Sequence, residues 1–231
     1  MEPLILCFDS STPAGSVALV SGSTVLAEIL LQVKQSSHSD YLMRYVHLLL
    51  EETGVSFADI DALSVVVGPG SFTGLRVGIA TVQGLAQVLS LPIYAVSSLQ
   101  TIAFANGPSD LPVLSLIDAR KKEVYAANYM WHGSVPVLQG HEQVIAPRLL
   151  LEQVTTRTFF VGNGVTLYQD LIRELLPQHS LLANSVNHVP RASAAGLLAV
   201  AMGNDVAVVN SFAIRPVYVR LSDAELQKLA C

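Results

Sequence analysis

The chain has 231 residues, of which 51% are hydrophobic and only 13% are charged, and its formal net charge is −5. This length allows one large domain or two smaller ones, with enough chain to bury a core. The low share of charged residues fits either a well-buried α/β core or an extra surface that a partner covers. Because phosphate contacts supply most of the affinity of a nucleic-acid-binding protein, the acidic balance argues against unaided nucleic-acid binding.

Neither membrane insertion nor secretion is predicted. The apolar stretch 73–91 contains an arginine and two glutamines, which makes it a poor membrane-spanning helix. The opening segment MEPLILCFDS has no basic region and no long apolar run, so we expect no signal peptide. The two cysteines form neither a disulfide framework nor a metal-binding pattern. We therefore expect a cytoplasmic protein with no membrane contact.

The first half of the chain alternates apolar runs with Pro- and Gly-containing turns, which predicts an antiparallel meander followed by helices and strands. Ser37 and Asp40 resemble a capping box at the start of the first helix, and Gly54 is expected to end it. In chain order we predict strands at 4–10, 16–21 and 24–33, a helix within 35–54, a strand at 62–67, a helix at 73–89, a strand at 92–96 and a helix from 98.

The stretch FANGPSDLP (104–112) is rich in Gly, Pro, Asn and Asp and predicts a domain boundary. Beyond it we predict strands at 113–118 and 123–131, a helix after 147, a strand within 157–164, a helix from 167 and a helix at 191–204. The pattern indicates an α/β protein with mixed sheets flanked by helices. We expect one domain over 1–106, a second, diverged domain over 107–215 and a C-terminal segment over 216–231.

Both halves begin with an apolar strand that ends in an aspartate. Asp9 ends the strand in CFDSS and Asp118 ends the strand in LIDAR, and each is followed by a turn and a second strand. Aspartate is common at strand ends and turns in any protein. Its occurrence at matching places in the two halves nevertheless favours an internal duplication.

The stretch VVVGPGSFTGLRVG (65–78) joins a strand to a helix through a glycine-rich turn, an arrangement that can cradle a phosphate. Leu75 stands where the P-loop needs lysine, and the dinucleotide fingerprint also fails. The stretch predicts instead a tight turn into a helix capped by Ser71 or Thr73. Free N–H groups at such a helix end can hold an anion.

The helix at 73–89 is apolar over most of its circumference, which predicts burial on two sides. One side fits the sheet of its own domain. The other fits either a neighbouring helix of the chain or a partner protein, and Gly74, Gly78 and Gly84 would let that element approach closely.

Three motifs together resemble the TsaB family, also called YeaZ: GPGSFTGLRVG (68–78), FDSSTPAGSVAL (8–19) and IDARKKEVYAA (117–127). This family supplies a subunit of the bacterial machinery that makes threonylcarbamoyladenosine beside the tRNA anticodon. The resemblance covers the whole chain in order and is densest over 4–130. It implies the actin/sugar-kinase/Hsp70 (ASKHA) fold, with two duplicated domains around a cleft.

The resemblance implies a non-catalytic scaffold subunit that binds and stabilises a TsaD-type catalytic subunit. It further implies a TsaE-type ATPase in a ternary complex, a homodimer when the chain is alone, and tRNA contact only indirectly, through the partners. The helices around 40–51 and 73–89 are the implied docking helices. The expected interface residues are Tyr41, Arg44, Tyr45, Leu48, Arg76, Ile79, Gln83 and Gln87.

In the superfamily's kinases the strand–turn–strand units bind phosphate, but the second unit here carries bulky basic residues where glycine is expected. We therefore expect no cofactor held firmly by this chain, with ATP bound at most at the level of the complex. The residues of a vestigial nucleotide or anion site would be Asp9, Ser10, Ser11, Ser71, Thr73, Asp118 and Arg120.

The catalytic paralogue TsaD carries a His-x-x-x-His metal pair, whose matching positions here are Ser98 and Ile102. Isoleucine cannot bind a metal, so we expect neither a metal site nor catalytic residues. Two enzymatic alternatives remain open: an ATP-dependent kinase or ATPase that uses Asp9 and Asp118, and a peptidase. The chain has no H-E-x-x-H motif and no nucleophile flanked by a recognisable base, which disfavours the peptidase.

Overall fold

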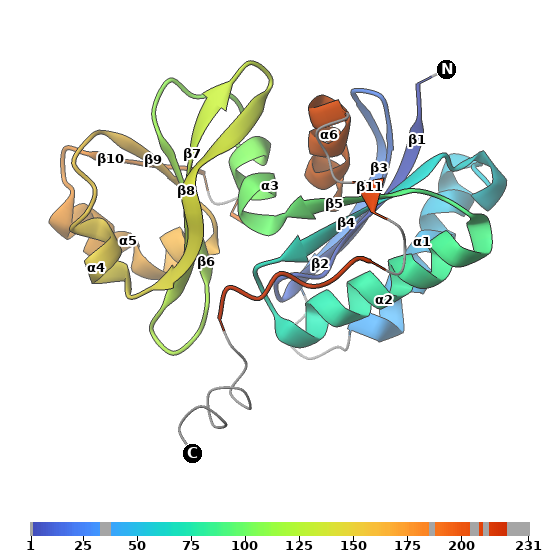
Figure 1. Cartoon of the computed structure of the whole chain (residues 1–231), viewed down its shortest axis with the longest axis horizontal. Helices are drawn as coiled ribbons and strands as arrows, with labels where there is room; N and C mark the ends of the chain where they lie inside the picture. The colour runs from blue at the N-terminus through green and yellow to red at the C-terminus, as the bar shows by residue number, and fades with distance from the viewer. Residues whose placement is uncertain (1, 33–37, 185–187, 204–207, 210–212, 221–231) are drawn as a thin grey trace.

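The computed structural model describes residues 2–32, 38–184, 188–203, 208–209 and 213–220. It shows two halves side by side, each built around its own mixed sheet (Figure 1). The strands of the first sheet are β1 (Leu4–Asp9), β2 (Ala14–Ser21), β3 (Thr24–Gln32), β4 (Ala62–Gly68), β5 (Ile93–Ser97) and β11 (Val208–Val209). Between them run α1 (His38–Thr53), the short 3-10 helix η1 (Phe57–Asp59), α2 (Phe72–Leu89) and α3 (Ser98–Ala105).

The second sheet is formed by the later part of the chain. Its strands are β6 (Val113–Asp118), β7 (Val124–His132), β8 (Val135–Ile145), β9 (Thr158–Val161) and β10 (Ser180–Leu182). The helices are α4 (Pro147–Leu151), α5 (Asn163–Leu175) and α6 (Ala192–Met202). None of the described helices is long and apolar enough to cross a membrane.

The two sheets repeat one topology. The strand order is β11-β5-β4-β1-β2-β3 in the first sheet and β10-β9-β6-β7-β8 in the second. In each, a three-stranded antiparallel meander continues into parallel strands, with β1 paired to β4 and β6 paired to β9 in parallel. The internal duplication and the expected ASKHA fold class are thereby confirmed.

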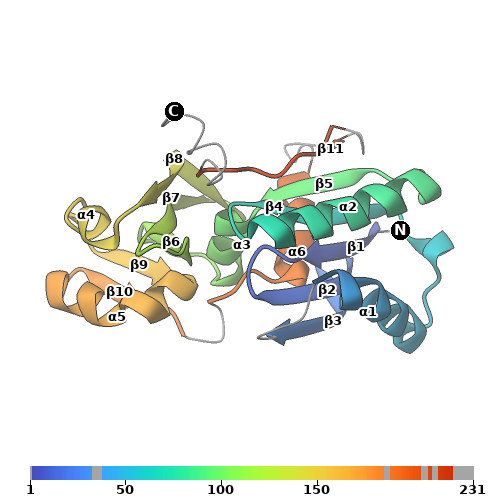
Figure 2. The ribbon, with the colours of Figure 1, turned by 90° about the horizontal axis from the view of Figure 1, so that it is seen from below.

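The third helix of each half packs on the sheet of the other half. α3 contacts β6, β7 and β8, α6 contacts β1, β2 and β4, and the two helices contact each other. Both lie in the middle of the molecule, as Figures 1 and 2 show. α6 and Ile214, both within the expected second domain 107–215, thus pack against the first half. The expected domain bounds, 1–106, 107–215 and 216–231, stay predictions.

Both faces of the first sheet are covered by helices. Leu6 and Phe8 face the cluster that contains α1 and α2, whereas Ile5 and Cys7 face α6. Strands buried on both faces carry apolar side chains on both, which accounts for the nearly continuous hydrophobic runs of β1 and β4. The small residues of α6 allow a close approach, because a Cβ on Gly196 would lie 2.4 Å from Cys7 Sγ.

Other differences from the sequence predictions are local. β8 was not predicted, α5 begins at Asn163 rather than near 167, and β10 and β11 were missed. β8 contains a bulge, since Ala126 pairs with Gln143 but Asn128 pairs with Gln139. This irregularity and the glycine within the strand conceal its alternating pattern. The predicted cap at Ser37 lies outside the described residues.

Candidate functional site

The turn between β1 and β2 is in contact with the glycine-rich loop that leads into α2. The Ser10 hydroxyl donates to the Gly74 carbonyl at 2.8 Å, and the Ser71 N–H donates to the Ser11 carbonyl at 2.6 Å. Ser71 also caps α2, because its Oγ accepts from the Gly74 N–H at 3.3 Å. Two of the three sequence motifs therefore form one structural unit.

Glycine is required at two positions of this unit. A Cβ at Gly70 would lie 2.1 Å from the Ser11 carbonyl oxygen, and one at Gly78 would lie 2.3 Å from Ser10 Oγ. The backbone of the loop and of α2 therefore packs directly against the turn. These contacts explain the glycines without a nucleotide.

Asp9, at the end of β1, is completely buried. Its Oδ1 accepts from the Ser11 N–H at 2.9 Å and from the Ser11 hydroxyl at 2.6 Å, while Oδ2 has no hydrogen-bond partner within the described structure. Burial, and to a smaller extent the nearby Glu28 carboxylate, raise the pKa of Asp9 to about 6, against the opposing effect of the Ser11 hydrogen bonds. Asp9 is positioned as a structural turn residue.

The corresponding turn of the second half is built differently. The Asp118 N–H donates to Asn163 Oδ1 at 2.9 Å, and Asp118 Oδ1 accepts from the Arg120 N–H at 2.8 Å. Arg220 closes the base of the turn by donating to the Ala119 carbonyl at 2.7 Å. The proposed vestigial site is thus split between two sheets, with Asp9, Ser10, Ser11 and Ser71 together at one turn and Asp118 and Arg120 together at the other. Thr73 is exposed in the first turn of α2.

The two positions matched to a histidine metal pair have structural roles in α3. The Ser98 hydroxyl donates to the Pro69 carbonyl at 2.5 Å, and Ile102 is fully buried in the cluster between α3 and the second sheet. Neither side chain offers a metal ligand of the imidazole type. Within the described ranges no group of three or more His, Cys, Asp or Glu side chains gathers as a metal site would require.

The expected interface residues fall into three groups by their exposure. Tyr41 and Ile79 are buried in the chain's own core, which corrects their assignment to an interface. Tyr45 and Gln83 are half-buried. The exposed members of the set are Arg44, Leu48, Arg76 and Gln87.

Residues 213–220 lie along α2, a contact that sequence analysis did not predict (Figure 1). The Val217 N–H donates to the Val67 carbonyl at 2.8 Å, and Gln83 Nε2 donates to the Ile214 carbonyl at 3.3 Å. Tyr218 stacks on Phe72 and accepts a hydrogen bond from Arg76 Nε at 2.9 Å. The segment therefore covers part of the side of α2 that carries Arg76 and Gln83, two of the expected interface residues.

Arg76 lies against both aromatic rings of this contact. Its guanidinium carbon is 3.7 Å from the centroid of Phe72 and 5.9 Å from that of Tyr218. Phe72 and Tyr218 are each 42% exposed. These cation–π contacts, together with the hydrogen bond to Tyr218, attach the Arg76 side chain to residues 213–220.

The remaining outward side of α2 is an exposed stripe of small and apolar residues. Ala80, Gly84 and Val88 follow one another at helical spacing and are all exposed, Val88 at 83%. On α1, Leu48 is 42% exposed. α1 and α2 contact each other, so this stripe and Leu48 belong to two adjacent helices on the side of the sheet opposite α6.

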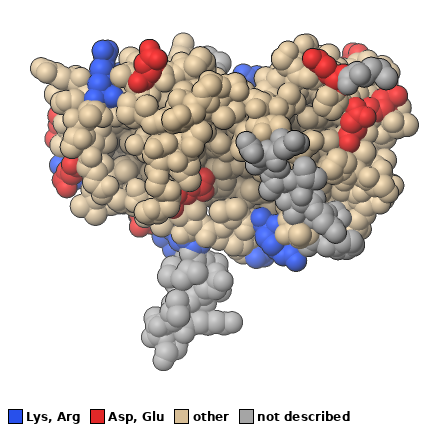
Figure 3. Space-filling model, turned by 45° about the horizontal axis from the view of Figure 1, so that its top comes forward, with Lys and Arg blue, Asp and Glu red and all other residues tan. Residues whose placement is uncertain are grey.

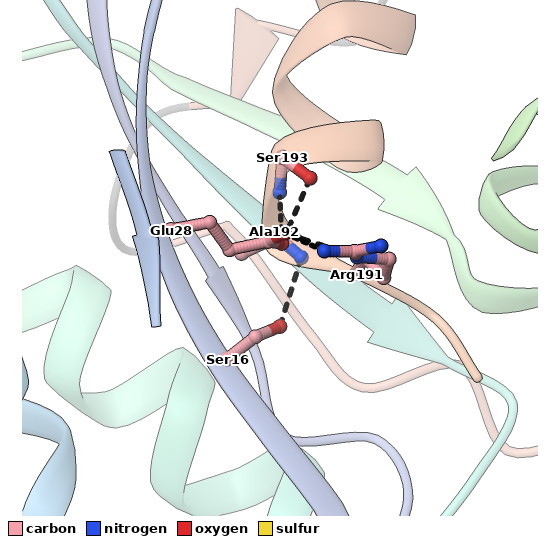
Figure 4. Close-up of polar contacts among 5 residues, drawn as sticks. All are labelled: Ser16, Glu28, Arg191, Ala192 and Ser193. Atoms are coloured by element: carbon pink, nitrogen blue, oxygen red, sulfur yellow. Dashed lines mark hydrogen bonds and ion pairs between the residues drawn. The ribbon is translucent and has the colours of Figure 1, made fainter. Parts of the chain in front are cut away.

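A buried carboxylate fixes the start of α6, a role that sequence analysis missed (Figure 4). Glu28 Oε1 accepts from the Ser193 hydroxyl at 2.8 Å and from its N–H at 3.1 Å, while Oε2 accepts from Arg191 Nε at 2.9 Å. The Ala192 N–H donates to Ser16 Oγ at 2.8 Å. The available signal was the single charge within the apolar strand TVLAEILLQ.

A groove of about 290 Å³ lies on the second half, between β7, β8 and the end of α4. Its lining includes Asn128, Gln143 and Thr158 and contains none of the residues predicted for a site. The groove is therefore separate from both strand–turn–strand units.

A family model described as "TsaD: tRNA N6-adenosine threonylcarbamoyltransferase" matches residues 24–226. Two similar proteins are named tRNA threonylcarbamoyladenosine biosynthesis protein TsaB. The one from Bacillus subtilis is 30% identical over 224 residues, 96% of each chain, and the one from Escherichia coli is 38% identical over 183 residues, 74% of this chain and 75% of the other.

Two solved structures are similar over almost their whole length. YeaZ from Pseudomonas aeruginosa is 32% identical, with a TM-score of 0.78 over 94% of this chain and 99% of that one. A second structure from the same organism, described as an uncharacterized protein with similarity to peptidase YEAZ, is also 32% identical, with a TM-score of 0.80.

Proposed function

Because the chain belongs to the TsaB family, we propose that it takes part in the biosynthesis of threonylcarbamoyladenosine in tRNA as a non-catalytic subunit. In this proposal it docks onto a TsaD-type catalytic subunit through the outward side of α1 and α2 and stabilises it. The E. coli and B. subtilis relatives carry the name of this pathway, which supports the first part. The second part rests on the chemistry of the exposed helices.

The observation that carries the docking proposal is Gly84. A Cβ at this position would meet none of the described atoms within 4 Å, and the residue lies in the interior of α2. Glycine inside a helix costs about 1 kcal/mol relative to alanine. Position 78 must be glycine because a Cβ there would clash with Ser10. No residue of the described part of the chain lies so close to Gly84. A partner protein whose surface packs closely against α2 would explain the glycine at position 84.

The composition of the stripe fits such a partner. Ala80 and Gly84 leave a flat surface, and Leu48 and Val88 add exposed apolar area beside it. Interface cores are depleted of charged residues, as this stripe is. On the face of the chain that Figure 3 shows, charged side chains are few and scattered, so low charge alone does not locate the interface.

The further parts of the proposal follow from family membership. They are a homodimer when the chain is alone, a ternary complex with a TsaE-type ATPase, indirect contact with tRNA through the partners, ATP bound only at the level of the complex, and action in the cytoplasm. A nucleotide held by this chain alone is disfavoured, because the loop before α2 and α2 itself pack directly against Ser10 and Ser11. The burial of the Ser10 and Ser11 hydroxyls likewise disfavours a peptidase.

The direct experiment is reconstitution of tRNA modification with the TsaD-type and TsaE-type partners, with and without this chain. The proposal predicts that modified adenosine accumulates only when the chain is present. Full modification in its absence would refute the assignment. Turnover of ATP or cleavage of a partner by the isolated chain would support one of the enzymatic alternatives instead.

A further inference from the structure

Residues 213–220 are attached to both halves of the molecule. Ile214 is buried in the core of the first half, and the Val217 N–H donates to the Val67 carbonyl at 2.8 Å. Arg220, three positions further on, is bound to the second half. One short segment therefore spans the junction between the two halves, as Figure 1 shows.

The end of β4 is shaped to receive this segment. The pairing of β4 with β5 passes from Val66 directly to Gly68, so Val67 is an extra residue of the kind found in a β-bulge. The Val67 carbonyl accepts from Val217 instead. Gly68 has a φ of 125°, and a Cβ there would lie 2.7 Å from the Val217 carbonyl oxygen. The bulge and the glycine together bring the segment against β4.

The other end of the segment is held by Arg220. Its guanidinium donates to the Ala119 carbonyl at 2.7 Å and pairs with the Glu123 carboxylate, and its guanidinium carbon lies 6.0 Å from the ring centroid of Tyr125. The Arg220 side chain is only 17% exposed. Because water screens it only partly, this ion pair is stronger than one at the open surface. The three contacts fasten the segment to the β6–β7 hairpin.

This attachment lies away from the other contact between the halves. α3 and α6 meet in the middle of the molecule, where each packs on the sheet of the other half. In Figure 1 residues 213–220 pass below both helices, between α2 and the second sheet. Two parts of a protein that are joined at one place can rotate about it. A second attachment at a distance restricts that rotation, so residues 213–220 are positioned to set the angle between the halves.

We propose that residues 213–220 act as a strap that fixes the angle between the two halves and links this angle to docking on α2. The strap has two anchors, Tyr218 on α2 and Arg220 on the β6–β7 hairpin. Releasing either anchor frees the halves to rotate about the contact of α3 with α6. The link to docking rests on the proposed function, whereas the setting of the angle does not.

Docking is expected to tighten the anchor on α2. Arg76, which contacts Phe72 and Tyr218, is exposed and lies about two turns before Gly84 on α2. A stable interface covers about 800 Å² of each partner, enough to include both positions. Excluding water strengthens the hydrogen bond from Arg76 to Tyr218, because the local dielectric constant falls. Partner binding and attachment of the strap therefore favour each other, and this coupling is reciprocal.

The first test measures the angle in the isolated chain. Spin labels are attached through Ser23→Cys in the β2–β3 turn and Glu174→Cys in α5, two exposed positions on different halves. Cys231→Ser removes the thiol at the last position, and Cys7 is buried and does not react. Double electron–electron resonance should give one narrow distribution of distances between the labels.

Two variants release the strap at its two anchors. Arg220→Gln removes the ion pair on the second half, and Tyr218→Ala removes the contact with α2; each should replace the narrow distribution by a broad one. Arg157→Gln removes an exposed cation elsewhere on the second half and should leave the distribution unchanged. Narrow distributions in both anchor variants, with folding verified by circular dichroism, would overturn the proposal.

The second test measures the link to docking by isothermal titration calorimetry with the purified TsaD-type partner. The contacts of Arg220 named above all lie on the second half, so an effect of Arg220→Gln on docking at α2 has to pass through the strap. This variant is expected to bind the partner at least about fivefold more weakly than wild type. Bound partner should in turn narrow the distance distribution of the labelled Arg220→Gln chain.

Wild-type affinity of the Arg220→Gln variant, together with a distance distribution that the partner leaves unchanged, would refute the link. A wild-type chain that does not bind the partner at all would refute the proposed function and the link with it. The distance measurements on the isolated chain decide separately whether residues 213–220 set the angle between the halves.

Discussion

Gly78 packs against Ser10 so closely that a Cβ on the glycine would lie 2.3 Å from the serine hydroxyl oxygen, which itself donates to the Gly74 carbonyl. This contact joins α2 to the β1–β2 turn. It explains why the loop before α2 and the start of α2 contain glycine at positions 70 and 78. The glycine-rich loop before α2 and the β1–β2 turn pack against each other.

Gly78→Ala is therefore expected to destabilise the chain by about 1–3 kcal/mol, the usual cost of an added methyl group in a packed contact. Urea unfolding followed by circular dichroism measures the change. The matched variant is Gly84→Ala in the same helix, which should stabilise the chain by up to about 1 kcal/mol because its Cβ meets no described atom. Equal effects of the two substitutions would contradict the assigned contacts.

Asp9→Asn is expected to change the pH dependence of stability. The pKa of Asp9 is raised from 3.8 to about 6 by burial, so the folded chain keeps a proton that the unfolded chain loses between these values. The contribution of Asp9 to the free energy of unfolding is therefore fully present below about pH 4 and is lost as the pH rises through 6. Asparagine does not titrate, so the Asp9→Asn variant does not lose this contribution as the pH rises. The free energy of unfolding of the variant minus that of wild type should therefore increase by roughly 3 kcal/mol between pH 4 and 7.

Urea titrations of both proteins at pH 4, 5, 6 and 7 test this expectation. All other titrating groups are common to the two chains, so the difference isolates Asp9. A stability difference that stays constant over this range would show that the Asp9 carboxyl titrates at its ordinary pKa.

Glu28→Ala is expected to loosen the attachment of α6 to the first sheet. Removing the carboxylate leaves Arg191 and the Ser193 donors at the start of the helix without their acceptor. Breaking a fully buried pair costs about 3–5 kcal/mol, and about 2–3 kcal/mol is expected here because the Arg191 side chain is 34% exposed.

Amide hydrogen exchange of α6, together with urea unfolding, measures this effect. Glu28→Gln keeps an acceptor oxygen and should be less damaging than Glu28→Ala. A loss below 0.5 kcal/mol, roughly the size of a surface substitution, would show that the contact in Figure 4 does not hold the helix.

The sequence predicts the order of most elements because hydrophobic periodicity is a local signal. The twin aspartates predict the duplication, and the apolar circumference of α2 predicts burial on two sides. Periodicity does not show which sheet a helix covers, so the exchange of α3 and α6 between the halves could not be predicted. The contact of residues 213–220 with Gln83 and Arg76 was missed for the same reason, since it joins segments more than 130 positions apart.

The candidate site was predictable only in part. Ser10, Ser11 and Ser71 do lie together, but the sequence does not show that the loop before α2 packs directly against the β1–β2 turn. Ile79 was expected at an interface because α2 is apolar on several sides, and only the structure separates the side facing the core from the side facing outward. Gly84 could be connected with the proposed docking surface only after the structure placed it on the outward side of α2.

The central claim is that a TsaD-type subunit binds the exposed stripe of α2, and isothermal titration calorimetry with the purified partner tests it most directly. Gly84→Arg places a large side chain on the stripe, and Leu167→Arg places one on α5, the equivalent helix of the second half, where Leu167 is 57% exposed. Both variants should remain folded, as circular dichroism can verify. The account predicts that Gly84→Arg weakens binding by at least about 100-fold, or about 2.7 kcal/mol, while Leu167→Arg binds like wild type. Wild-type affinity of the Gly84→Arg variant would contradict it.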